Sequence, residues 1–316
     1  MATAYLALPE RIEDDGIVDF VQQLVSCGSA SEIIIDGVAA GIHAAGALAA
    51  SASMRRRWER GGSAVKLINC DVWPLQKCFE GSFLARDSFG PGATIGLTSP
   101  VYEVLPAPGQ VEEISSALAA AVAPGGWSSG PLYPLIQYCF GELLRNCVQH
   151  TGESGFAVVQ ERCSPLGPVE FVRLAVADCG RGARASFVEN QSPEATPDMS
   201  DARAIDRALT PWISSTRYLP RLPYGHSSNM GVGLTMVKEL ARATAGHFAM
   251  ISGTAWLLQT PNGASVTGSF YPAAWPGCIV AVSLGVKLLN DYGDMLVAAR
   301  QALGLTPAKD IDKLFQ

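Results

Sequence analysis

The sequence predicts an α/β protein of 316 residues with two domains. In the N-terminal third, a strand, an Ala-rich helix and a second strand follow one another between residues 32 and 69. Farther along, a helical pattern at 134–148 precedes an alternating strand at 170–177, and a Gly-rich loop then opens a helix at 235–246. With 48% hydrophobic and 16% charged residues, the chain has ample material for two cores.

The N-terminal third alternates between strand and helix patterns. An Ile-rich strand at 32–36 precedes a helix at about 44–60, and Gly61-Gly62 separates that helix from a strand at 64–69. A connection between parallel strands is right-handed by default, so we expect these elements to form a small α/β layer.

The progression from this strand through 73–79 resembles a STAS domain, the fold of anti-sigma-factor antagonists. In phosphorylated STAS domains a serine stands where the loop after the strand enters the helix. Here that region, 41–46, reads Gly-Ile-His-Ala-Ala-Gly and lacks a hydroxyl. The resemblance therefore implies a unit that docks or scaffolds a partner protein and does not accept a phosphoryl group. His43 is expected to be structural.

A carboxylate and a carboxamide share one face of the helix expected at 134–148. Glu142 and Asn146 are four residues apart, so their side chains lie one turn apart on the same face. Mg²⁺ takes oxygen ligands and is commonly held by one or two protein groups together with substrate phosphates. The pair suits a hydrated cation, although the same spacing is common on solvated helix faces.

The strand at 170–177 runs directly into Asp178-Cys179-Gly180-Arg181-Gly182. An Asp at the end of a buried strand can accept a hydrogen bond from an exocyclic amine, and adenine carries one. Gly180 and Gly182 permit a close approach of the backbone to a ligand. The alternative is an ordinary turn in which Asp and Gly are favoured for backbone reasons alone.

A Gly-rich loop, Gly231-Val232-Gly233-Leu234, opens the helix expected at 235–246. Free N–H groups and the dipole at a helix N-terminus attract anions, so this loop suits a triphosphate. It is not a Walker A loop, because no Gly-Lys-Ser/Thr follows.

The interval 183–230 before this loop is too long for an ordinary connection in a compact domain. We expect a mobile lid that closes over the phosphates. Arg217, in the hydroxyl-rich run Ser214-Ser215-Thr216-Arg217, is the favoured contact to the γ-phosphate. The residues considered for that contact are Arg203, Arg207, Arg217, Arg221 and His226.

In order, these three segments resemble the N, G1 and G2 boxes of the GHKL ATPase superfamily over roughly residues 125–288, and 142–150 especially resembles histidine kinases and the serine kinases that regulate sigma factors. The resemblance implies a Bergerat α/β sandwich, with helices on one face of a mixed sheet, that binds ATP and Mg²⁺. By the family pattern Asn146 holds Mg²⁺, Glu142 orients or deprotonates the attacking nucleophile, and Asp178 binds adenine. The positions that shape the pocket are Gly180, Gly182, Gly231, Val232, Gly233 and Leu234.

Two further positions bear on that resemblance. His150 is expected to support the site from the end of the helix. Cys278 stands where the family usually has a hydroxyl before an alternating strand, and it is also consistent with a buried core thiol.

The expected organisation has four parts. They are a STAS-like domain at 1–98, a linker and leading helix at 99–124, a GHKL ATP-binding domain at 125–289, and a C-terminal helix and tail at 290–316.

Composition limits the partners and the compartment. A net charge of −6 argues against broad binding to nucleic-acid phosphates, and we expect Arg55-Arg56-Arg57 to be a solvated helix face. Eight cysteines without a Cys-x-x-Cys pair, and no charged-then-apolar leader, favour a cytoplasmic protein. The Ala- and Gly-rich stretch at 33–54 is too weakly hydrophobic to span a membrane.

The expected function is that of a Mg-ATP-binding regulator that hydrolyses ATP slowly or acts as a protein serine kinase. Its STAS-like domain would recognise a protein partner, and a homodimer is left open. The alternative is a nucleotide-gated interaction protein without significant turnover, in which ATP orders the lid. The presence of Glu142 favours turnover.

Overall fold

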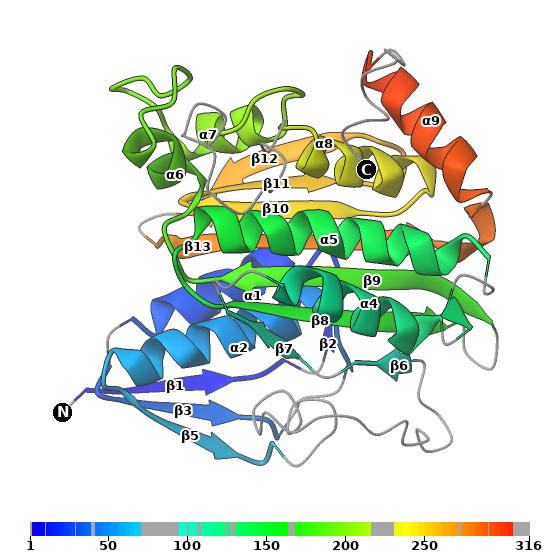
Figure 1. The fold of residues 1–316 in the computed structure, drawn as a ribbon. Helices are drawn as coiled ribbons and strands as arrows, with labels where there is room; N and C mark the ends of the chain where they lie inside the picture. The colour runs from blue at the N-terminus through cyan, green and yellow to red at the C-terminus, as the bar shows by residue number, and fades with distance from the viewer. Residues whose placement is uncertain are drawn as a thin grey trace.

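The computed structural model has a mixed α/β architecture, as the sequence predicts (Figure 1). It contains an eight-stranded sheet, a three-stranded sheet and a two-stranded ribbon. The residues that the structure describes are 2–9, 11–28, 30–38, 42–70, 95–99, 101–105, 109–123, 125–126, 130–163, 168–215, 231–270, 273–289 and 291–305.

The large sheet has the strand order β12-β11-β10-β13-β9-β8-β6, and β7 also pairs with β8. All of its described pairings are antiparallel, so the expected mixed sheet is wrong. Short turns join β10 to β11 and β11 to β12, and such turns connect antiparallel strands. The strands are β6 (Ile95–Thr98), β7 (Tyr102–Val104), β8 (Gly155–Cys163), β9 (Val169–Asp178), β10 (Phe248–Gly253), β11 (Ala255–Gln259), β12 (Ser265–Ser269) and β13 (Trp275–Gly285).

One face of this sheet is covered by α4 (Gln110–Val122), α5 (Leu132–His150), α8 (Gly233–Ala243) and α9 (Tyr292–Ala302), with the 3₁₀ turn η2 (Val286–Leu288) before α9 (Figure 1). The apolar face predicted for α5 is confirmed, because Leu135, Cys139, Leu143 and Cys147 are all buried in the core between the helices and the sheet. Burial of that face sets the rotation of α5, which places its polar residues at the edge of the core.

The N-terminal unit covers the opposite face of the large sheet. Its parallel sheet has the order β1-β3-β5, and the predicted strand, helix and parallel strand are confirmed as β3, α2 and β5. Helices α1 and α2 lie between the two sheets and share one apolar core with both (Figure 1). The elements are β1 (Thr3–Ala7), β2 (Arg11–Ile12), α1 (Ile17–Ser26), β3 (Glu32–Asp36), β4 (Ile42–His43), α2 (Ala45–Arg60) and β5 (Ala64–Ile68).

The Ala-rich composition of α2 follows from this position. Residues 45–54 of the helix are all buried, including Ser51 and Ser53. A side chain on Gly46 would come within 3.1 Å of Ala281 in β13 and 3.2 Å of Ile17 in α1, so glycine at this position lets α2 lie close to both the large sheet and α1. The helices α5 and α8 of the expected ATP-binding domain thus lie on one face of the large sheet, and α1 and α2 of the N-terminal unit cover the other face.

The basic cluster at the end of α2 contacts the rest of the chain. Arg56 forms an ion pair with Glu103 in β7, and Arg57 donates to the carbonyl oxygen of Cys179 at 3.4 Å. Arg55 instead pairs within the helix, with Glu59 at 2.7 Å. Arg57 is exposed and 43% of the Arg56 side chain is exposed, so the expected solvated face is retained, while both residues also join the N-terminal unit to the large sheet. Arg60 continues this contact by pairing with Glu153 in the turn after α5.

The boundary regions are also structured. The expected linker at 99–124 contains β7 and α4, both of which pack on β8, and β6 from the expected N-terminal domain pairs with β8 as well.

Among the described residues, no helix is long and apolar enough to cross a membrane.

The first part of the expected lid is helical and anchored. It forms α6 (Ala183–Glu189) and α7 (Asp201–Ala208), where the sequence suggested little regular structure. Asp201 accepts hydrogen bonds from the N–H and the hydroxyl of Thr254 at 2.8 and 2.9 Å, which fixes α7 to the β10–β11 turn. Arg217, Arg221 and His226 lie outside the described residues.

Candidate functional site

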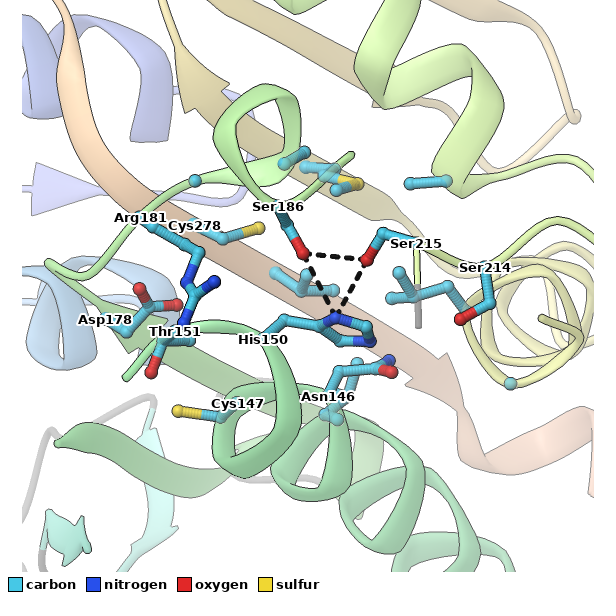
Figure 2. A pocket seen from close by; sticks show the side chains of 18 of the residues that line it. Asn146, Cys147, His150, Thr151, Asp178, Arg181, Ser186, Ser214, Ser215 and Cys278 are labelled. Carbon is cyan, nitrogen blue, oxygen red and sulfur yellow. Dashed lines mark hydrogen bonds between the residues drawn. The ribbon is translucent and has the colours of Figure 1, made fainter. Parts of the chain in front are cut away.

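A cavity lies between α5, the loop after β9, α6 and the first turn of α8 (Figure 2). It contains about 830 Å³ of empty space, a volume that includes the part open to solvent. Residues from all three segments singled out in the sequence line it together: Asn146, Asp178, Gly182, Gly231, Gly233 and Leu234.

Other predicted residues lie behind the lining. Gly180 is in contact with α5, because a side chain there would stand 2.5 Å from the carbonyl oxygen of Thr151. Val232 is the N-cap of α8. Glu142 lies directly beside Gly233, where an added side chain would overlap its carboxylate. Arg217 falls outside the described residues, and so no contact is assigned to it.

Asp178 ends β9 and is almost fully buried, with 3% of its surface exposed. Its Oδ1 accepts a hydrogen bond from the N–H of Gly180 at 2.9 Å, and its carbonyl oxygen accepts one from Trp275 Nε1 at 2.8 Å. Burial raises the pKa of the carboxyl to about 7. The N–H groups of Gly180 and Cys278 stabilise the charged carboxylate and so partly oppose this rise in the pKa. A ligand amine that donated to this carboxylate would offset its desolvation.

Glu142 lies where α5 meets the start of α8. Its Oε1 accepts from Arg145 Nη1 at 2.7 Å, one turn along the helix. Burial raises the pKa of Glu142, and the neighbouring Arg145 opposes that rise. A mostly buried carboxylate beside a helix N-terminus is suited to act as a base on a group bound there.

Gly231 allows the described part of the expected lid to contact the Gly-rich loop before α8. It has φ of +71°, and an added side chain would overlap the backbone of Ile213. Its carbonyl oxygen also accepts from the N–H of Trp212 at 3.0 Å. The close approach explains why glycine is needed here without any ligand, and it places the Ser214-Ser215 end of the lid next to α8.

A triangle of polar groups occupies the centre of the cavity. His150 Nδ1 lies 3.2 Å from Ser186 Oγ and 3.1 Å from Ser215 Oγ, and the two hydroxyls are 2.7 Å apart (Figure 2). Burial, together with the positive charge of Arg181, lowers the pKa of His150 to about 4. The expected supporting place of His150 agrees with its position at the end of α5.

Sequence reasoning missed two residues at this site, Ser186 and Arg181. Ser186 lies on α6, inside the interval 183–230 that is expected to be a lid, and Arg181 belongs to the turn in which only Asp178, Gly180 and Gly182 are assigned to a ligand. The signal that could have found Ser186 is its place four residues after Gly182, in a run of helix-compatible residues.

Apolar residues and thiols form the rest of the wall. Cys278 lines the cavity beside Asp178, and burial holds the pKa of its thiol well above the ordinary value. It is therefore a weakly polar wall residue with little thiolate character at neutral pH. The apolar side chains facing the cavity include Leu143, Val176, Phe187, Met250 and Val280.

Comparisons with protein-family models, with curated proteins and with solved structures found no match to this chain. Among the described residues, no group of three or more His, Cys, Asp or Glu side chains is arranged to hold a metal ion. A magnesium ion at Asn146 would share its coordination with a bound ligand and water.

Proposed function

We propose that this chain is a Mg-ATP-binding regulatory protein of the GHKL type that hydrolyses ATP slowly or transfers its γ-phosphoryl group to a protein. The observation that carries the proposal is the convergence of three separated segments, around Asn146, Asp178 and Gly231–Gly233, on one cavity. The resemblance assigns these segments to magnesium, adenine and phosphate, and each is chemically suited to that ligand.

A nucleotide bound in this cavity would lie along α5. Gly180 packs on Thr151 at the C-terminal end of α5, whereas Gly233 packs on Glu142 about 13 Å earlier along the helix. A nucleotide lying along α5 would thus place adenine at Asp178 and its phosphates at the N-terminus of α8. Asn146 lies between these ends, where it would hold Mg²⁺ against the phosphates.

In the proposed reaction, Glu142 orients or deprotonates the attacking water or hydroxyl near the γ-phosphate. Free N–H groups at the start of α8 and Mg²⁺ would stabilise the charge that develops on the transferred phosphoryl group. These electrostatic contributions supply most of the acceleration in this class of reaction.

A second candidate is a nucleotide-gated interaction protein without significant turnover. The ion pair between Glu142 and Arg145 favours it, because a carboxylate held by a guanidinium is a weaker base. In this case ATP would order the lid and change a binding surface.

The proposal assigns protein recognition to the STAS-like N-terminal unit of a cytoplasmic protein. Helix α2 is already enclosed between two sheets, so a partner would use the outer surface of this unit. That surface includes exposed Tyr5, Val38 and Ile68 around the three-stranded sheet.

Calorimetric titration with Mg-ATP and Mg-GTP, followed by a phosphate-release assay, tests the proposal. We expect ATP-selective binding, loss of release in Glu142→Gln with ATP affinity retained, and loss of binding in Asp178→Ala and Asn146→Ala. Glu113→Gln, at an exposed position of α4, is the matched control. Absence of ATP binding by the wild-type protein would refute the proposal, whereas binding without release would favour the gated alternative.

Replacing Arg145 by Met should move the acid limb of the pH–rate profile to higher pH. Arg145 favours the charged carboxylate of Glu142, so its removal raises the pKa of that group, and a higher pH is then needed to deprotonate it. ATP affinity should change by no more than about twofold. An unshifted profile in steady-state assays from pH 5 to 9 would contradict a role for Glu142 as the base.

A further inference from the structure

The polar triangle of His150, Ser186 and Ser215 joins three elements across the cavity. His150 ends α5, Ser186 lies on α6, and Ser215 belongs to the lid segment that follows α7. Both serines are buried, with 4% and 5% of their surfaces exposed, and both line the cavity. Figure 2 shows the three side chains pointing toward one another, with Asp178 to one side and Ser214 to the other.

The triangle lies between the two ends of the proposed nucleotide. His150 is one helical turn beyond Asn146 and directly precedes Thr151, against which the loop of Asp178 packs. On the other side, Ser215 follows Ile213, whose backbone is in contact with Gly231 near the start of α8. The group of a nucleotide that lies between its base and its phosphates is the sugar.

The hydrogen-bonding capacity of the triangle suits a hydroxyl. If Nδ1 carries the proton, it can donate to one serine, that serine to the other, and the last hydroxyl proton remains for a ligand. If Nε2 carries it, both hydroxyl protons are used within the triangle and acceptor lone pairs remain. A sugar hydroxyl donates and accepts, so it matches either tautomer, whereas a phosphate oxygen only accepts.

The charge of the triangle also favours a hydroxyl over a phosphate. With a pKa of about 4, His150 is neutral near pH 7 and adds no positive charge to attract phosphate. Asn190 Nδ2, 3.5 Å from Ser215 Oγ, is also neutral. The triangle itself therefore carries no positive charge, and the cation that acts on it is Arg181, which lines the same cavity.

We infer that Ser186, Ser215 and His150 form a ribose-recognition site, which makes this protein selective for ribonucleotides over deoxyribonucleotides. The inference rests on the proposed binding of ATP. Because the two serines belong to the lid and His150 to α5, a bound ribose hydroxyl would also join the lid to the body of the domain.

Dissociation constants for Mg-ATP, Mg-2′-deoxy-ATP and Mg-3′-deoxy-ATP test this inference in the wild-type protein and in Ser186→Ala and Ser215→Ala. We expect the wild-type protein to bind at least one deoxynucleotide about 5- to 10-fold more weakly than ATP. In each serine variant, the affinity for ATP should fall toward the affinity for the deoxynucleotide. The preference for ATP over the deoxynucleotide should then be about twofold or less. Ser192→Ala is the matched control, since its buried hydroxyl lies in the lid but does not line the cavity.

The outcomes separate the two proposals. Equal affinity of the wild-type protein for all three nucleotides would overturn ribose recognition while leaving ATP binding in place, and this comparison needs no variant that must fold. An unchanged preference in both serine variants, with all affinities reduced together, would assign the triangle a structural role only. Failure of the wild-type protein to bind ATP would overturn the proposed function and this inference with it.

Discussion

Asp178→Asn is expected to stabilise the ligand-free protein above pH 7 by up to about 4 kcal/mol. The carboxyl has a pKa of about 7 in the folded protein and an ordinary value of 3.8, and that difference corresponds to about 4 kcal/mol. Since the folded pKa is the higher one, the stabilisation from protonated Asp178 is fully present below pH 3.8. It is lost progressively as the pH rises to about 7, where a buried charge remains.

The amide avoids this loss because it is neutral at every pH and has the same shape. Its carbonyl oxygen can still accept the hydrogen bond from Gly180, so the turn after β9 should be retained. Its NH₂ group would then face the adenine amine as donor against donor, and ATP affinity should fall by about 100-fold or more. The same change therefore raises stability and removes function.

Urea unfolding without nucleotide at pH 4 and pH 8, combined with ATP titration at pH 8, would measure both effects. The stability gain should be present at pH 8 and small at pH 4. Asp294→Asn, at an exposed site in the first turn of α9, controls for the loss of one negative charge. Equal stability of variant and wild type at pH 8, or retained ATP affinity, would contradict the assignment of Asp178.

Local patterns predicted much of the fold. The burial of Leu135 and Cys139 on α5 follows from helical periodicity, and the end of β9 at Asp178 follows from strand alternation before a glycine turn. The assembly of Asn146 and Asp178 in one cavity was reached only through the family resemblance, because spacing alone does not bring distant segments together.

Tertiary contacts explain what the sequence did not reveal. Helix α2 is buried because a second sheet covers it. Considered alone, the helix has low hydrophobicity because its buried residues are small, so its sequence does not indicate burial. The ion pair between Arg56 and Glu103 could not be predicted, because the two residues are distant in sequence. Ser186 gains its significance only from His150 and Ser215, on two other segments.

Neutralising Glu13 and Asp14 together should destabilise the protein by about 3–5 kcal/mol, because Arg173 would be left buried without its anionic partners. Arg173, in the middle of β9, has 2% of its surface exposed. Its Nε donates to Asp14 at 3.0 Å, its Nη2 donates to Glu13, and its Nη1 lies 3.5 Å from the side-chain Oε1 of Gln160. This cluster fastens the N-terminal unit to the large sheet.

Adding Arg173→Met to Glu13→Gln and Asp14→Asn should recover most of the lost free energy of unfolding. A methionine fills the space with apolar atoms and leaves no charge to desolvate, so the triple variant avoids the penalty of the double variant. Urea unfolding measures the cycle, and Glu112→Gln with Glu113→Gln on α4 controls for the change in net charge. A loss below about 1 kcal/mol in the double variant would mean that Arg173 is solvated.

The same cycle tests whether the N-terminal unit supports the end of the cavity at Asp178. Strand β9 carries both Arg173 and Asp178, and α2 contacts the residue after Asp178 through Ser53 Oγ, 3.1 Å from Cys179 Sγ. Loosening the unit should therefore weaken ATP binding in the double variant, and the triple variant should restore it in proportion to the recovered stability. Unchanged ATP affinity across the cycle would show that the cavity holds its shape without the N-terminal unit.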